Sequence, residues 1–245
     1  MLYPSYQVDS VIGVAEKSEL KPERRHLFSF MFVMMLSGAT QGYTDYSNQA
    51  AALYNVQYHW TEQHEITVHQ QYIGASIILG CTLGAAMGGK LMQHGRRMAH
   101  FVACGVGMLG VSFTLLKDFP MQLIGRTIYG FAAGLQSVIS PRFIEEYMPL
   151  DLCGTSIAVF SFAQNAGLFV ALFIAYFLPD DTDRSAVAVN ATWRLMFGLP
   201  MLTYSVMILW LIFFVPNDSA RFYISQGDKP RAIENIHEVY RTHED

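Results

Sequence analysis

The sequence is dominated by six long stretches that are almost free of charge. Each holds about 20 mostly apolar residues, the length of helix that spans a hydrocarbon core about 30 Å thick. Backbone polar groups in lipid need partners within the protein, which favours helices throughout. The sequence therefore predicts an all-α membrane protein with six transmembrane helices. The stretches run from 27 to 44, 67 to 89, 98 to 116, 119 to 140, 155 to 178 and 195 to 215.

Charge placement predicts how this bundle is oriented. The chain is only 15% charged, against about 25% in soluble domains. Of its 16 Lys and Arg residues, twelve fall on the side that holds both ends of the chain and three fall opposite, while Arg126 lies within the fourth stretch. Since positively charged loops stay on the cytoplasmic or matrix side, we expect a multi-pass protein with both termini on this inner side.

Composition divides the chain into three segments. Residues 1–26 form a polar N-terminal segment at the inner face, with no apolar run and no small-residue cleavage site, so they do not read as a signal peptide. Residues 27–215 form the transmembrane bundle, and residues 216–245 form an inner-face tail.

The tail has the pattern of two short amphipathic helices. Ser219 is placed to cap a helix that ends near Gly227, and Asp228 with Pro230 is placed to begin another. We expect both helices at the inner membrane face, where they either cover the bundle or dock a partner. The second helix has an apolar stripe that consists of Ala232, Ile233, Ile236, Val239 and Tyr240.

Glycines recur every fourth residue in two of the six stretches. They are Gly80, Gly84 and Gly88 in the second stretch and Gly130 and Gly134 in the fourth. A repeat of this kind places a smooth groove on one helix face and lets a neighbouring helix approach closely. We therefore expect these five residues to act in helix packing.

Six groups of residues occur in a fixed order along almost the whole chain. They are Gly42-Tyr43; Gly88-Gly89-Lys90-Leu91 with Gly95-Arg96-Arg97; Gly125-Arg126 with Gly130 and Gly134; Pro141, Glu146, Pro149 and Gly154; Trp193-Arg194 with Gly198 and Pro200; and Ser219-Ala220-Arg221. In this order and at this spacing they resemble the N-terminal six-helix half of a major facilitator superfamily sugar porter or of a related synaptic-vesicle-protein-like transporter.

The resemblance implies a function in solute transport. Such transporters bind substrate near the membrane midplane between two six-helix halves, and one half rocks against the other. A chain with one half supplies one wall of that cavity, so a sugar or small organic solute would be moved only with a second six-helix half, from a homodimer or a separate protein. The alternative is a structural accessory subunit of a larger membrane complex, derived from a transporter half. Transport would favour the plasma membrane, and the accessory role an organellar inner membrane such as the mitochondrial one.

Arg126 is the residue that points most directly to a solute or coupling site. It lies about two helical turns, roughly 10 Å, from the outer end of its stretch, where a charge must face the bundle interior or water and needs a partner. Asp45 lies at a similar depth in the first helix, and the resemblance implies that both helices face one cavity. We predict that Asp45 and Arg126 meet, directly or through water. Backbone carbonyls and hydroxyls are the alternative partners for Arg126.

Three amides complete the predicted substrate site. Gln136, Gln164 and Asn165 lie on the helices that the resemblance places around the cavity, where they would hydrogen-bond a hydroxylated solute. The alternative is that these amides hydrogen-bond across helices.

The resemblance also implies an inner-face gating relay made of Arg96, Arg97 and Glu146. In the family such charges lock one state of the transporter. This chain departs from the family pattern at two relay positions, where Gln93 replaces an aspartate and Cys153 replaces an arginine. The acid expected after Gly42-Tyr43 is also displaced by one residue to Asp45.

The sequence does not indicate an enzyme, a metal site or a nucleic-acid-binding protein. It contains no nucleophile with a credible base and no phosphate-binding glycine loop, so we expect no enzymatic activity. Its cysteines and histidines lack metal-ligand spacing, and we expect neither metal nor cofactor. No basic aromatic surface for nucleic acid is present. Asn190 begins a glycosylation sequon whose use would require a secretory route.

Overall fold

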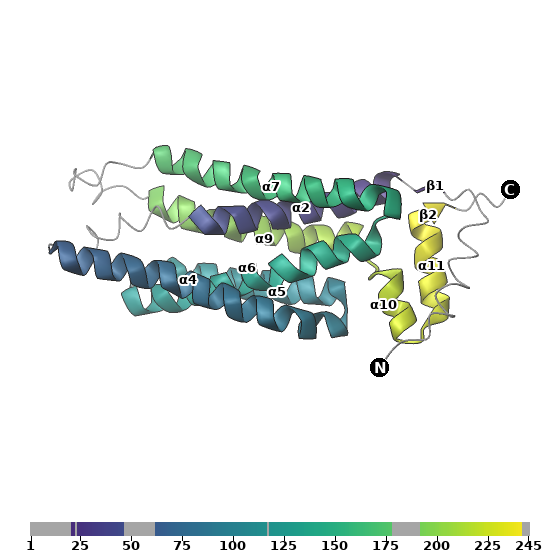
Figure 1. Cartoon of the computed structure of the whole chain (residues 1–245), viewed down its shortest axis with the longest axis horizontal. Coiled ribbons are helices and arrows are strands. Elements are labelled where there is room, and N and C mark those ends of the chain that lie inside the picture. The colour runs from purple at the N-terminus through teal and green to yellow at the C-terminus, as the bar shows by residue number, and fades with distance from the viewer. Residues whose placement is uncertain (1–20, 23, 47–61, 117, 178–191, 242–245) are drawn as a thin grey trace.

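Six long helices run side by side in one elongated bundle (Figure 1). The computed structural model describes residues 21–22, 24–46, 62–116, 118–177 and 192–241. Each of the six helices overlaps one of the apolar stretches, so these stretches are helical as predicted. The helices are α2 (Arg24–Tyr46), α4 (Gln63–Leu91), α5 (Arg96–Thr114), α6 (Phe119–Tyr147), α7 (Leu150–Tyr176) and α9 (Thr192–Phe214).

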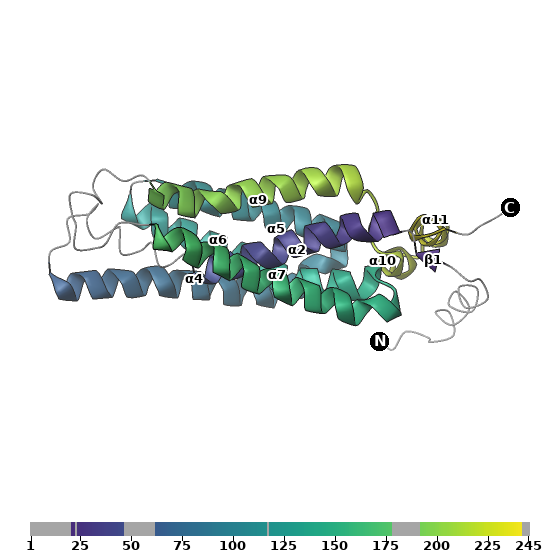
Figure 2. The same cartoon turned by 90° about the horizontal axis from the view of Figure 1, so that it is seen from above.

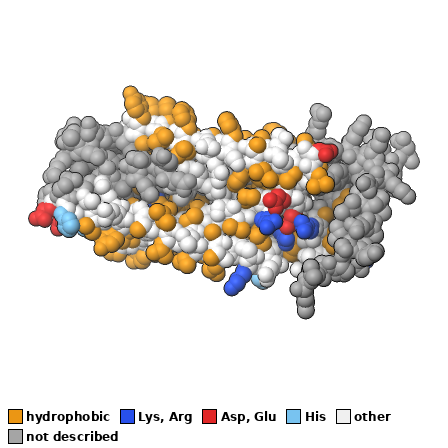
Figure 3. Space-filling view, viewed as in Figure 1, with side chains coloured by type: hydrophobic (Ala, Val, Ile, Leu, Met, Phe, Trp, Pro, Cys, Tyr) orange, Lys and Arg blue, Asp and Glu red, His pale blue; other side chains and the backbone are white. Residues whose placement is uncertain are grey.

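The outside of the bundle is apolar. Large hydrophobic side chains are exposed along α4, α7 and α9. In the view of Figure 3, hydrophobic side chains cover the length of the bundle, while charged ones gather at one tip and in one cluster toward the other end. In the described part of the chain, three helical segments are long and apolar enough to cross a membrane, namely Thr67–His94, Leu150–Tyr176 and Arg194–Phe214.

Short turns connect the helices at one end of the bundle, which we call the α10 end (Figures 1 and 2). The 3-10 turn η2 (Met92–His94) and Gly95 join α4 to α5, and Met148 with Pro149 joins α6 to α7. Gly95 has a φ of 115°, and a Cβ there would lie 2.6 Å from an oxygen of Asp218. This turn therefore requires glycine both for its backbone conformation and for space.

The glycine repeats lie where α4 and α6 meet. A Cβ added to Gly80 or Gly84 would collide with carbonyl oxygens of α6, and one added to Gly130 or Gly134 would collide with carbonyl oxygens of α4. Gly88 is less crowded, since its Cβ would lie 3.1 Å from a side-chain atom of α6. These two backbones approach so closely that a larger residue at most of these positions would force them apart.

A second seam of small residues joins α2 to α7. A Cβ on Gly42 would collide with the carbonyl of Gln164, and a Cβ on Gly167 would collide with the carbonyl of Ala39. This seam was not predicted from the sequence, although Gly38 and Gly42 have the same four-residue spacing. At both seams the backbones of the facing helices lie close together.

The tail forms the two short helices α10 (Ala220–Ser225) and α11 (Lys229–Val239). The Ser219 hydroxyl accepts a hydrogen bond from the Phe222 N–H at 3.2 Å, as expected for a cap. The turn that follows α10 passes through Gly227, whose φ is 80°. The short strand β1 (Lys21–Pro22) pairs antiparallel with β2 (Tyr240–Arg241). This pairing joins the two ends of the described chain and was not predicted.

The apolar stripe of α11 is only partly buried. Ala232 is buried, but Ile233 is 50% exposed and Asn235 is buried in its place. The placement of this stripe at the inner membrane face, or against a partner, stays a prediction. The side chains of the last stripe residues, Val239 and Tyr240, lie outside the described residues.

Candidate functional site

Arg126 is enclosed within the bundle. Its side chain is 1% exposed, and its guanidinium carbon lies 4.3 Å from the centre of the Phe197 ring of α9. A cation over an aromatic face is attracted by the ring quadrupole, most strongly where water is excluded. The space that Arg126 shares with Thr114 of α5 and Tyr129 of α6 is too narrow for a water molecule. Phe197 was not predicted as a neighbour, since nothing in its local sequence links it to Arg126.

The predicted contact between Asp45 and Arg126 stays a prediction. Asp45 belongs to the last turn of α2, but its side chain lies outside the described residues. The neighbouring Thr44 occupies the position where the family pattern has an acid, and its hydroxyl lies 2.7 Å from the Tyr129 hydroxyl. Tyr43 donates to the Met196 carbonyl at 2.7 Å. This end of α2 is therefore bonded to both α6 and α9 next to Arg126.

The three predicted amides lie in three different surroundings. Gln164 of α7 donates to the side-chain oxygen of Gln41 of α2 at 2.9 Å. Gln136 of α6 is fully buried and its amide nitrogen lies 3.8 Å from the sulfur of Cys104 on α5. Asn165 is exposed and donates to the Ser161 carbonyl of its own helix at 2.9 Å. The structure thus does not bring the three amides together.

Gln41 is a polar residue that the sequence analysis missed. It is 6% exposed and its amide nitrogen has no hydrogen-bond partner among the described residues. Together with Gln164 it forms an amide pair, which we call the Gln41–Gln164 pair, between α2 and α7. The sequence feature that could have indicated Gln41 is its position within the first apolar stretch, directly before Gly42.

A second buried polar contact links three helices. The hydroxyls of Ser37 of α2 and Ser140 of α6 lie 2.8 Å apart, and Ser140 lies 3.4 Å from the Nε2 atom of His100 on α5. All three side chains are buried. Such contacts add specificity to the packing of apolar helices, because a displaced helix would leave polar groups unpaired.

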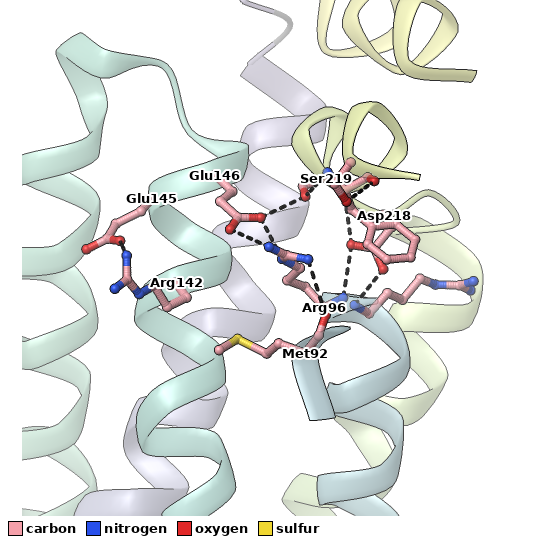
Figure 4. Close-up of polar contacts among 10 residues, drawn as sticks. Met92, Arg96, Arg142, Glu145, Glu146, Asp218 and Ser219 are labelled. Carbon is pink, nitrogen blue, oxygen red and sulfur yellow. Dashed lines mark hydrogen bonds and ion pairs between the residues drawn. The ribbon is translucent and has the colours of Figure 1, made fainter. Parts of the chain in front are cut away.

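Charged residues at the α10 end form a set of contacts that we call the end latch, made of Arg96, Glu146, Asp218 and Ser219 (Figure 4). The Arg96 guanidinium reaches both carboxylate oxygens of Glu146, with Nε 2.6 Å from Oε2 and Nη2 donating to Oε1 at 2.8 Å. The Ser219 hydroxyl donates to Glu146 at 3.0 Å. One carboxylate on α6 therefore holds the start of α5 and the start of α10.

Asp218 completes the end latch by capping α5. Its carboxylate accepts hydrogen bonds from the backbone N–H groups of Arg96 at 3.1 Å and Arg97 at 3.0 Å. The first N–H groups of a helix have no partner within it, so a carboxylate satisfies them and complements the helix dipole. Burial raises the pKa of Asp218 above its ordinary value, although these backbone donors oppose the shift.

Two members of the predicted relay, Arg96 and Glu146, are thus brought together. The third member, Arg97, makes other contacts. Its guanidinium donates to the Leu211 carbonyl at 3.2 Å and lies over the Phe101 ring. Asp218 and Ser219 were not predicted as partners of these charges.

These features together define a class of protein. A bundle of long helices with an apolar surface, buried polar side chains and an enclosed arginine is typical of a multi-pass integral membrane protein.

The family model for sugar (and other) transporters matches residues 30–245, and the chain therefore belongs to this family. Hexose transporter 1 of Toxoplasma gondii is 25% identical over 189 residues, which cover 74% of this chain and 33% of that transporter. The D-xylose-proton symporter of Escherichia coli K12 is 29% identical over 178 residues, which cover 64% of this chain and 36% of the symporter.

Solved structures show the same fold. The major facilitator superfamily proton:xylose symporter XylE, bound to 6-bromo-6-deoxy-D-glucose, superimposes with a TM-score of 0.73 at 21% identity, covering 87% of this chain and 50% of XylE. The partially occluded inward-open form of XylE from E. coli gives the same TM-score and covers 54% of that chain. The chain therefore spans about half the length of these structures and about a third of its sequence relatives.

These comparisons confirm the resemblance to a sugar porter of the major facilitator superfamily. The relatives are transporters and not enzymes, in agreement with the expectation from the sequence. They lend no support to the alternative of a structural accessory subunit.

Proposed function

We propose that this chain forms the first six-helix half of a sugar porter and moves a monosaccharide or a similar hydroxylated solute together with a second six-helix half. The observation that carries the proposal is the continuous family match over residues 30–245, combined with a fold that corresponds to about half of a xylose symporter. The second half would come from a further segment of a longer chain, from a second copy or from another protein.

We propose that all six long helices cross the membrane. Three helical segments have the necessary hydropathy and length. Between two of them, α5 leads away from the α10 end and α6 returns to it (Figure 1), so this pair would cross as well. At about 1.5 Å per residue, even α5 with its 19 residues is about 28 Å long. The polar residues of α2 that lower its hydropathy, such as Ser37, Gln41 and Thr44, are buried and would not meet lipid.

The excess of Lys and Arg at the α10 end supports an orientation with this end on the cytoplasmic or matrix side. The solute would then bind between the two halves near the midplane. We propose that the Gln41–Gln164 pair donates and accepts hydrogen bonds there, since one amide nitrogen of the pair has an unused donor. The proposed role of Asp45 and Arg126 is to couple movement of the solute to movement of a proton.

Counterflow of labelled glucose and xylose into proteoliposomes tests the proposal. The chain would be purified with whatever second half accompanies it in its native membrane, and native mass spectrometry would identify that half. We expect saturable uptake that falls about tenfold in Gln164→Ala, the loss that one hydrogen bond of about 1.4 kcal/mol produces. A Ser205→Ala variant is the control, because its exposed hydroxyl bonds only to its own helix.

Two results would contradict this account. Absence of counterflow for every sugar, with the second half present, would refute the transport function. Uptake that is unchanged in Gln164→Ala would leave the function standing but remove the Gln41–Gln164 pair from the substrate site.

A further inference from the structure

A pocket of about 440 Å³ lies at the α10 end, between the ends of α4, α5 and α6 and one side of α10. The pocket lies beside the end latch, and the side chains of the end latch leave its volume open. Three arginines line it, Arg96, Arg142 and Arg221, and among the described residues one acidic residue, Glu146, belongs to the lining. The pocket is therefore positively charged. Neutral donors complete its walls, namely Gln93, Ser225 and Gln226.

The three arginines differ in how far their charge is already used. Arg96 is committed to Glu146. Arg142 pairs with Glu145 at 3.1 Å, but these side chains are 64% and 43% exposed, and an ion pair this exposed contributes at most about 1 kcal/mol. Arg221 has no carboxylate within ion-pair distance among the residues with described side chains. Arg142 and Arg221 are thus the two lining arginines, one on α6 and one on α10, whose charge is not held in a buried ion pair.

We propose that this pocket binds a phosphate group, and that the phosphate belongs to the headgroup of an anionic membrane lipid. Guanidinium groups match phosphate in geometry and charge, and bind it with paired hydrogen bonds. The location favours a lipid over a soluble anion, because the charged side chains cluster toward the α10 end of a largely apolar bundle surface (Figure 3), and basic pockets at this level of a membrane recruit anionic headgroups. Only the assignment to the inner leaflet depends on the orientation proposed above.

A bound headgroup would act as a bridge. It would join Arg142 on α6 to Arg221 on α10 and thereby add a further attachment of the tail, besides the contacts that Asp218 and Ser219 make in the end latch. The position of the tail would then depend on the lipid composition of the membrane. No residue of the proposed sugar site takes part, so binding can be measured without transport.

The test uses the full purified chain in a neutral detergent, titrated with short-chain phosphatidic acid and, separately, with inorganic phosphate. We expect Arg142→Gln and Arg221→Gln each to weaken lipid binding about tenfold, as loss of a charge-assisted hydrogen bond does. Arg231→Gln is the matched control, since Arg231 is 70% exposed and pairs with a carboxylate three residues away, as Arg142 does, but lies outside the pocket. We expect it to change the dissociation constant less than about twofold.

The variant Gly89→Leu tests whether binding depends on the shape of the pocket and not on its charge alone. Gly89 lines the pocket, and a Cβ added there would meet no atom within 4 Å, so the variant should fold and place its side chain in the pocket. We expect it to weaken lipid binding as strongly as the arginine variants. Equal losses in Arg142→Gln and Arg231→Gln, or full binding in Gly89→Leu, would show general charge attraction and overturn the site. Inorganic phosphate that binds as tightly as the lipid would overturn the lipid assignment.

Discussion

The substitution Glu146→Gln tests the end latch most sharply, because the neighbouring Glu145 provides a matched control. Glu146 and its partner Arg96 are 9% and 18% exposed, and removal of one partner from a buried ion pair costs about 3–5 kcal/mol. Glutamine retains neutral hydrogen bonds to Arg96 and Ser219, so we expect a loss of about 2–3 kcal/mol. Glu145 makes an exposed pair with Arg142, and Glu145→Gln should lose less than about 1 kcal/mol.

Thermal unfolding in detergent measures this difference. A loss of 1 kcal/mol lowers the melting temperature of a chain of this size by about 2–4 °C, so Glu146→Gln should lower it by about 4–12 °C. A thiol-reactive dye reports the transition, because the Cys104 thiol is buried on α5, the helix that the end latch holds. Equal shifts for the two glutamate variants would refute the claim that burial makes Glu146 the stronger partner.

Three further predictions concern other parts of the bundle. Gly84→Leu should lower the free energy of unfolding by about 3 kcal/mol or more, because the larger side chain forces α4 away from α6. Gly74→Ala should raise it by up to about 1 kcal/mol, because this helical position has no atom within 4 Å of the added Cβ. The melting temperatures of the two variants in detergent test both expectations. The pKa of Asp218 is raised in the folded state, so the folded chain should lose stability as the pH rises from the ordinary pKa of 3.8 through the raised pKa. In a plot of melting temperature against pH, Asp218→Asn should remove this decrease. A double-mutant cycle of Gln41→Ala and Gln164→Ala should give a coupling energy of about 1 kcal/mol; additive effects would contradict the amide contact.

Features fixed by local sequence were predictable. The four-residue repeat of Gly80 and Gly84 places both on one helix face whatever that face contacts, and it marked the helix that meets α6. Ser219 capped α10 as predicted because a cap depends on residues only three positions away. Arg96 and Glu146 were named as members of one relay because the family resemblance supplied their neighbourhood.

Features that depend on distant parts of the chain were not predictable. Asp218 caps a helix that begins 122 residues earlier, and nothing in its own surroundings indicates this. The neighbours of the predicted amides were not predictable for the same reason. Gln136 and Gln164 were grouped by chemistry, but each faces a different neighbouring helix, and helix neighbours are a property of the assembled bundle.

The end latch also bears on how a gate at this end would work. All its contacts join α5, α6 and α10 within one six-helix half. When a half rocks as a rigid body, contacts inside it stay intact, so the end latch by itself stabilises the half and does not distinguish inward-open from outward-open states. A gate needs a contact that breaks between the halves. Within the long helices at this end, Arg142 of α6 has an ion pair exposed enough to exchange for a partner on a second half, as the Arg231 pair of the tail also is. A gating role therefore fits the exposed arginine better than the buried ion pair beside it.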